Sequence, residues 1–127
     1  MGSGWRLERV AGTYAVCRLD SSEPVPPWAN SGAFISITRT PQELSVVVEE
    51  GRLPPGVRTE GGFAALRVAG SIDFSLTGVL STLTVPLAEA GVSLFAISTY
   101  DTDYLFVRRY DLETAIAALR SAGHEVR

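Results

Sequence analysis

The stretch Phe95-Ala-Ile-Ser-Thr-Tyr-Asp-Thr-Asp-Tyr-Leu-Phe-Val107 decides the fold of this chain, because two apolar runs in it meet at a polar tip. β-Branched and aromatic residues on both sides are typical of strands, and Asp101-Thr102-Asp103 supplies the side chains that reverse a chain between strands. The pattern therefore predicts a β-hairpin whose tip carries hydroxyls and carboxylates. A cation held there would form charge-assisted hydrogen bonds worth about 1.5–3 kcal/mol each. Two interpretations stay open: a site for a small polar ligand, or an ordinary polar turn.

Length and composition restrict the class of protein. The chain has 127 residues, of which 46% are hydrophobic and 20% charged, as expected of a folded globular protein. Its net charge is −3, so we expect no nucleic-acid partner, because phosphate binding usually requires a basic excess. A single cysteine, Cys17, and a single histidine, His124, exclude an internal disulfide and a Cys/His zinc site, and we expect neither metal nor cofactor. With no signal peptide and no membrane-spanning stretch, we expect a cytoplasmic protein.

Hydrophobic periodicity divides the chain at a connector from Gly51 to Gly62, which contains two prolines and four glycines. Before the connector we expect strands over 14–19, 33–38 and 44–49 and a proline-rich loop over 22–30. After the connector we expect, in order, a strand over 63–68, a helix over 76–90, hairpin strands over 95–100 and 104–108, a helix over 111–122 capped by Asp111, and a short edge strand over 124–126.

The order of these elements indicates the fold class. Strand, helix, strand, strand, helix, strand is the ferredoxin-like βαββαβ arrangement of α+β proteins, an antiparallel sheet with its helices on one face. The first half of the chain resembles a reduced copy of the same unit. We therefore expect two units in tandem, with domains at 1–61 and 62–127.

The segment that begins the predicted helix at 76–90 complements the polar tip. Ser75 or Thr77 is expected to cap this helix, and Gly78 allows a ligand to approach the backbone. The unpaired N–H groups of a first helical turn attract a carboxylate, with a dipole contribution of about 0.3–1 kcal/mol. A helix start beside a carboxylate-rich tip matches a zwitterion. The alternative is that the glycines serve only a tight turn and helix packing.

Five motifs, spread over nearly the whole chain, resemble one known family. They are Gly78-Val79, Pro86-Leu87-Ala88-Glu89-Ala90-Gly91-Val92-Ser93-Leu94, Ile97-Ser98-Thr99-Tyr100-Asp101-Thr102-Asp103-Tyr104, Asp111-Leu112 and, in the first half, Thr38-Arg39-Thr40-Pro41-Gln42-Glu43-Leu44-Ser45-Val46-Val47-Val48. The chain resembles the ACT-domain proteins related to the cytosolic arginine sensors, the CASTOR family.

The resemblance implies a regulatory sensor that holds a free amino acid at an interface between ACT units and performs no catalysis. Carried over by position, the ligand-binding residues are Thr77, Gly78, Val79, Ser93, Leu94, Thr99, Tyr100 and Asp103. Because the arginine sensors hold several such units in one chain, the resemblance also implies a homodimer here, and a downstream protein regulated by it. Leu76 stands where the arginine-sensing pattern has an acidic residue, so the amino acid that is bound stays open.

Two alternatives remain, one to the homodimer and one to the sensor. The alternative to the homodimer is that the first half of the chain supplies the facing unit, which would make the ligand site intramolecular. The other is a small α+β enzyme or a ligandless dimeric assembly module, since a fold does not by itself determine a function. The chain has no lysine, and neither His124 nor Cys17 lies near the candidate loops in sequence, which disfavours the enzyme because general-base work near neutral pH needs such a group.

Overall fold

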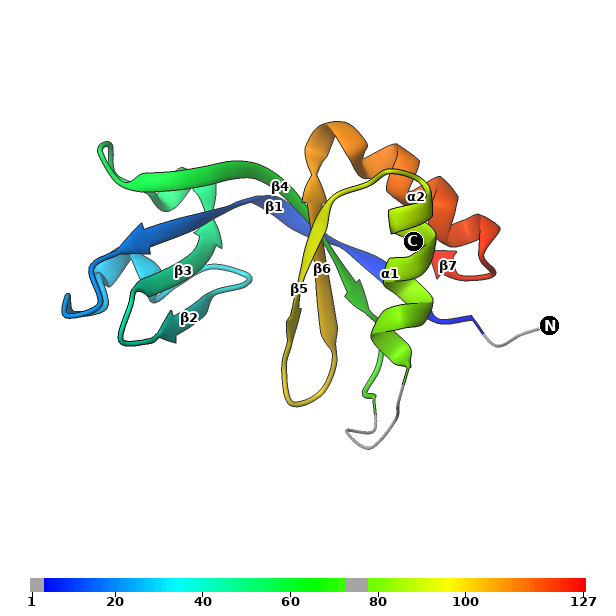
Figure 1. Ribbon diagram of the computed structural model, residues 1–127, viewed down its shortest axis with the longest axis horizontal. Coiled ribbons are helices and arrows are strands. Elements are labelled where there is room, and N and C mark those ends of the chain that lie inside the picture. Colours follow the sequence, from blue (N-terminus) through cyan, green and yellow to red (C-terminus); the bar gives the residue numbers. More distant parts are fainter. Residues whose placement is uncertain (1–3, 73–77) are drawn as a thin grey trace. The chain divides into compact units, whose positions relative to one another are not determined.

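The computed structural model describes residues 4–72 and 78–127, and the chain divides into two compact units (Figure 1). The larger unit consists of residues 1–10 and 64–127, and the smaller unit of residues 11–63. Two long strands, β1 (Arg6–Leu19) and β4 (Arg58–Val68), contribute residues to both units. Among the helices that the described residues form, none is both long and apolar enough to span a lipid bilayer.

The larger unit confirms the predicted α+β order of strands and helices. After β4 follow α1 (Val79–Glu89), β5 (Leu94–Ser98), β6 (Asp103–Arg108), the 3-10 turn η3 (Arg109–Asp111), α2 (Leu112–Ser121) and β7 (Glu125–Val126). The strands lie in the order β1-β4-β6-β5, and β7 pairs with β1. The hairpin of β5 and β6 is antiparallel, as its sequence predicts.

The start of β1 differs from the sequence prediction. A strand was expected from Tyr14, whereas β1 begins at Arg6 and pairs in parallel with β7, with Arg6 opposite Glu125 and Leu7 opposite Val126. The reason is that Leu7 is a lone fully buried residue among polar neighbours, so these residues show little of the alternation that marks a strand. The pairing with β7 places this part of β1 between β4 and β7.

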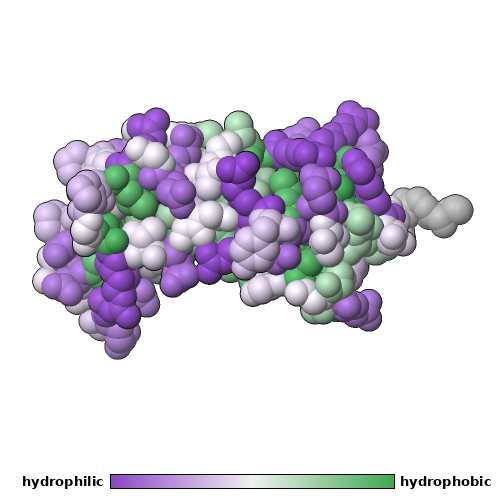
Figure 2. All heavy atoms as spheres, turned by 90° about the horizontal axis from the view of Figure 1, so that it is seen from above, coloured by the Kyte–Doolittle hydropathy of each residue, from purple (hydrophilic) through white to green (hydrophobic). Residues whose placement is uncertain are grey.

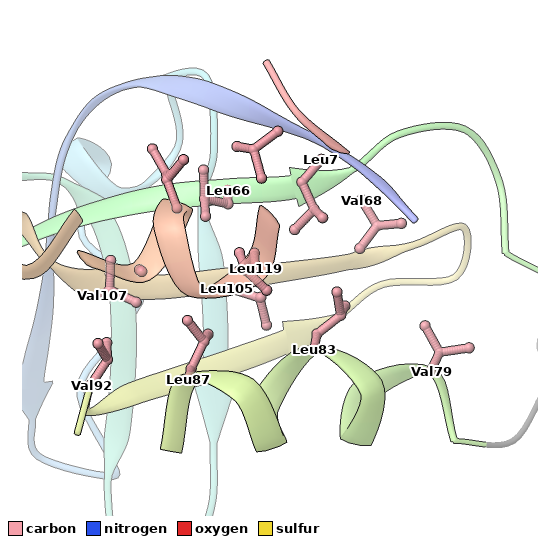
Figure 3. Packing of buried hydrophobic residues seen from close by; sticks show 13 residues of the cluster. Leu7, Leu66, Val68, Val79, Leu83, Leu87, Val92, Leu105, Val107 and Leu119 are labelled. Carbon is pink, nitrogen blue, oxygen red and sulfur yellow. The ribbon is translucent and has the colours of Figure 1, made fainter. Parts of the chain in front are cut away.

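One hydrophobic core holds both helices against the sheet of the larger unit (Figure 3). Helix α1 directs Val79, Leu83 and Leu87 toward the strands, at the four-residue spacing that keeps side chains on one helical face. Helix α2 contributes Ala115, Ile116 and Leu119 to the same cluster. The strand residues of the cluster alternate along β4 and β6, namely Leu66 and Val68, Leu105 and Val107. Because alternate residues of a strand share a face, both helices cover the same face of the sheet.

Glycine residues lie at the start of α1 and just beyond the end of α2. Gly78 occupies the N-cap position of α1 with a left-handed φ of 76°, and Gly123 follows α2 with a φ of 99°. Asp111 takes the N-cap position of α2, as predicted, but its side chain makes no capping hydrogen bond. Ser75 and Thr77, the predicted caps of α1, lie outside the described residues.

The smaller unit contains the second predicted hairpin. Strand β2 (Ser36–Arg39) pairs antiparallel with β3 (Leu44–Glu49), and β3 pairs antiparallel with the second half of β1. The proline-rich loop holds the single turn η1 (Pro27–Ala29), and η2 (Glu50–Arg52) follows β3. The core of this unit is formed by the buried residues Cys17, Ala29, Leu44, Val46 and Val48.

On the face of the molecule seen in Figure 2, most of the surface is hydrophilic, and the hydrophobic residues lie in small groups between polar ones.

Candidate functional site

The tip of the β5–β6 hairpin is a closed turn held by its own hydrogen bonds. The N–H of Thr99 donates to the carbonyl of Thr102 at 2.8 Å, and the N–H of Thr102 donates back to the Thr99 hydroxyl at 3.2 Å. The strands are paired up to the turn, so that Ser98 lies directly opposite Asp103. These bonds give the tip a defined shape.

Two further hydrogen bonds tie the tip to the end of β4 and the loop after it. The Thr102 hydroxyl donates to the carbonyl of Val68 at 2.8 Å, and the N–H of Ile72 donates to the carbonyl of Asp101 at 2.7 Å. Thr102 is only 7% exposed, so its hydroxyl satisfies a carbonyl that is shielded from water. The tip and the loop that leads toward α1 are thus held side by side.

A pocket of about 230 Å³ lies where the hairpin tip meets the start of α1. The described residues that line it are Ile72, Gly78, Val79, Leu80, Ser98, Thr99, Tyr100, Asp101, Thr102 and Asp103. All of them belong to the larger unit. The volume lies below the usual range of about 300–1,000 Å³ for drug-sized ligands and suits a small molecule.

Asp103 is a buried carboxylate of the pocket. The residue is 8% exposed, and its Oδ1 accepts a hydrogen bond from the Ser98 hydroxyl at 2.5 Å. No lysine, arginine or histidine is among the described residues that line the pocket. Buried carboxylates are otherwise paired with a cation, because an uncompensated buried charge costs several kcal/mol. A cationic group in the pocket would supply that compensation.

The start of α1 offers the opposite polarity. The carbonyl of Gly78 accepts the first intrahelical bond, from the N–H of Thr82 at 3.1 Å, and also the hydroxyl of Ser81 at 3.0 Å. The N–H groups of the first turn have no acceptor within a helix, and they carry the positive end of the helix dipole. Gly78 presents no side chain, so a carboxylate can approach the backbone here.

The structure brings together five of the eight residues expected to bind ligand. Gly78, Val79, Thr99, Tyr100 and Asp103 line the pocket, and Tyr100 stands at its rim with 84% of its surface exposed.

The other three expected residues are not part of this lining. Thr77 lies outside the described residues. Leu94 pairs with Val107 at the end of β5 away from the tip, and Ser93 precedes it. Their expected role requires a second ACT unit, and it stays a prediction.

Five lining residues were not among the expected ligand contacts: Asp101 and Thr102, which belong to the predicted polar tip, and Ile72, Leu80 and Ser98. Ser98 is the cross-strand partner of Asp103, which the hairpin register would have revealed once the tip was limited to residues 99–102. Ile72 is brought in by its backbone bond to Asp101, a contact without a sequence signal. Leu80 follows Val79 in the first turn of α1.

Comparisons with known proteins agree with this architecture. A family model described as an ACT domain matches residues 58–121, about half of the chain, and a model of an N-terminal domain matches residues 12–56. A crystal structure of a protein from Agrobacterium tumefaciens is 38% identical with a TM-score of 0.93, covering 99% of this chain and 94% of that one. The ligand-free regulatory subunit of aspartate kinase from Thermus thermophilus shares the fold, with a TM-score of 0.60 at 13% identity, over 88% of this chain and 93% of that one.

Curated relatives point the same way. The chain is 35% identical to the human cytosolic arginine sensor for mTORC1 subunit 1, a match that covers 68% of this chain and 30% of that protein. It is 33% identical to the human putative protein CASTOR3P, over 69% of this chain and 62% of that protein. The chain thus spans 30% of the length of the arginine sensor that it matches. It belongs to the ACT-domain family and is related to the cytosolic arginine sensors.

Proposed function

We propose that this protein is a non-catalytic regulatory sensor that binds a free amino acid in the pocket between the hairpin tip and the start of α1. The observation that carries the proposal is Asp103, a carboxylate that is 8% exposed, lines the pocket and has a neutral hydroxyl as its partner there. A site that buries a negative charge beside a helix start has one place for an ammonium group and one for a carboxylate. Free amino acids carry both groups on one carbon atom.

In this proposal each end of the pocket has its own role. Asp103 holds the ammonium group through the oxygen that Ser98 leaves open, and the backbone from Gly78 to Val79 receives the carboxylate. Thr99 and Tyr100 contact the ligand from the hairpin, and Thr77, the residue before Gly78 in the sequence, is proposed as a further contact. The relation to proteins named arginine sensors supports an amino acid as the ligand.

The organisation of the working protein is also a proposal. We infer two ferredoxin-like ACT units in tandem, a reduced one at 1–61 and a complete one at 62–127. Ser93 and Leu94 would contact the ligand from a second complete unit, so the protein would work as a homodimer with its sites shared between two chains. Light scattering tests this: a monomer that binds its amino acid with full affinity would rule out the shared site. We further propose that the sensor acts in the cytoplasm on a downstream protein.

A thermal-shift panel of all twenty amino acids tests the proposed function. A ligand at a hundredfold excess over its dissociation constant adds about 2.7 kcal/mol to the free energy of unfolding, which raises the melting temperature by roughly 8 to 20 °C for a chain of this size. We expect at least one amino acid to produce such a shift. If none does at millimolar concentration, the sensor is rejected in favour of an assembly module without ligand.

A further inference from the structure

The part of the chain that builds the pocket contains acidic side chains and no basic ones. From Val68 to Val107 the sequence contains four carboxylic side chains and no lysine, arginine or histidine. Two of the four, Asp101 and Asp103, are among the residues that line the pocket. The absence of a basic residue from this segment is a property of the sequence. It therefore holds for every residue from Val68, the last residue of β4, to Val107, the residue before Arg108 at the end of β6.

The two carboxylates of the pocket differ in their surroundings. Asp103 is buried and hydrogen-bonded to Ser98, whereas Asp101 is exposed at the tip. The backbone of Asp101 is held in place, because its carbonyl accepts the N–H of Ile72 at 2.7 Å. The remaining wall of the pocket includes the apolar side chains of Ile72, Val79 and Leu80. A ligand side chain in this pocket would thus meet apolar groups and one negative charge.

We propose that the pocket selects among amino acids by charge: it takes those with neutral or basic side chains and rejects acidic ones, and Asp101 is the specificity-determining residue. This inference rests on the proposed function, in which Asp103 is compensated by the ammonium group of the ligand. Asp101 then remains as the uncompensated charge next to the ligand side chain. A second carboxylate brought into the same small space would repel it, with no basic group from this segment to offset the repulsion.

The physical basis of the selection also predicts its salt dependence. Asp101 lies at the rim, where charges are partly screened by solvent ions, and the screening length falls from about 10 Å at 0.1 M salt to about 3 Å at 1 M. The rejection of acidic side chains should therefore weaken as the salt concentration rises. A rejection by shape alone would not change with salt.

Isosteric ligand pairs separate charge from shape. Glutamate and glutamine, and likewise aspartate and asparagine, are measured by calorimetry in competition with the amino acid that gives the largest thermal shift, so that weak binding is still ranked. In the parent protein at low salt, we expect each amide to bind at least about tenfold more tightly than its acid, a difference of about 1.4 kcal/mol. In the Asp101→Asn variant this ratio should shrink by a factor of about three or more. Asp20→Asn, the same change at an exposed position of the smaller unit, should leave the ratio unaltered.

Each outcome decides a separate point. An acid that binds as tightly as its amide overturns the charge selection, as does a panel led by aspartate or glutamate. A ratio that is the same in Asp101→Asn as in Asp20→Asn removes Asp101 from the role. A panel in which no amino acid binds rejects the proposed function itself, and that result is distinct from a panel led by an acidic amino acid.

Discussion

Replacement of Asp103 by asparagine separates a ligand-binding carboxylate from a structural one. The change keeps the size and shape of the side chain and removes its charge. Asp103 is 8% exposed, and its Oδ1 accepts the Ser98 hydroxyl at 2.5 Å. A structural carboxylate at this position would be needed in the free protein, whereas a ligand-binding carboxylate would be needed only in the complex.

In the free protein the substitution has two opposing effects. Asparagine can still accept the Ser98 hydroxyl, but a bond between neutral groups contributes about 0.5–1.5 kcal/mol, against about 1.5–3 kcal/mol for one to a charged group. At the same time, the desolvation penalty of the buried charge disappears, and that penalty can reach several kcal/mol. We therefore expect the free energy of unfolding of the Asp103→Asn variant to stay within about 1 kcal/mol of the parent, or to rise.

In the complex the substitution has one main effect, the loss of the negative charge that pairs with the ammonium group of the ligand. Without the charge, the interaction with the ammonium group of the ligand weakens by about 1–3 kcal/mol, which lowers the affinity roughly 5- to 150-fold. Urea unfolding without ligand, and calorimetry with the amino acid that gives the largest thermal shift, measure the two quantities. Asp20→Asn serves as the control for the change in net charge. The reasoning is refuted if Asp103→Asn unfolds more easily than the parent by more than about 2 kcal/mol, or if it binds with the parent affinity.

Two further predictions concern stability. His124 is 7% exposed, its Nδ1 accepts the N–H of Trp5 at 2.9 Å, and its Nε2 donates to the carbonyl of Thr82 at 3.0 Å. Because both partners would be left unpaired, His124→Ala should lower the free energy of unfolding in urea by about 2–4 kcal/mol. A loss below about 0.5 kcal/mol would contradict this structural role. Burial raises the pKa of the Cys17 thiol, and the hydrogen bond from the Thr59 hydroxyl opposes this with a smaller effect. The neutral thiol therefore contributes its full stability below the ordinary thiol pKa, and this stability is lost as the pH rises through the raised pKa of the folded protein. The parent should thus lose stability in alkaline urea titrations relative to Cys17→Ala, and parallel curves for the two proteins would argue against it.

The local signals of the chain were sufficient for most of its elements. The hairpin of β5 and β6, the hairpin of β2 and β3, and helix α2 were all expected within a few residues of their observed bounds. Each depends on periodicity and turn chemistry, which act between residues close in sequence. The same holds for the candidate site, where Gly78 and Asp103 belong to two short motifs that the sequence alone makes visible.

By itself, then, the sequence determined most of the strands and helices, and that the segment from Val68 to Val107 carries no basic side chain. It did not determine where the two long strands begin: β1 begins at Arg6 and not at residue 14, and β4 begins at Arg58, inside the predicted connector. Tertiary structure alone decided that β1 lies between β4 and β7, and that His124 meets Trp5 across 119 positions of the chain. It also decided that Asp103 is buried in a pocket and not exposed on an ordinary turn. The physical reason is that strand order and burial arise from contacts between segments distant in sequence, and the free energies of these contacts cannot be predicted from a local sequence pattern.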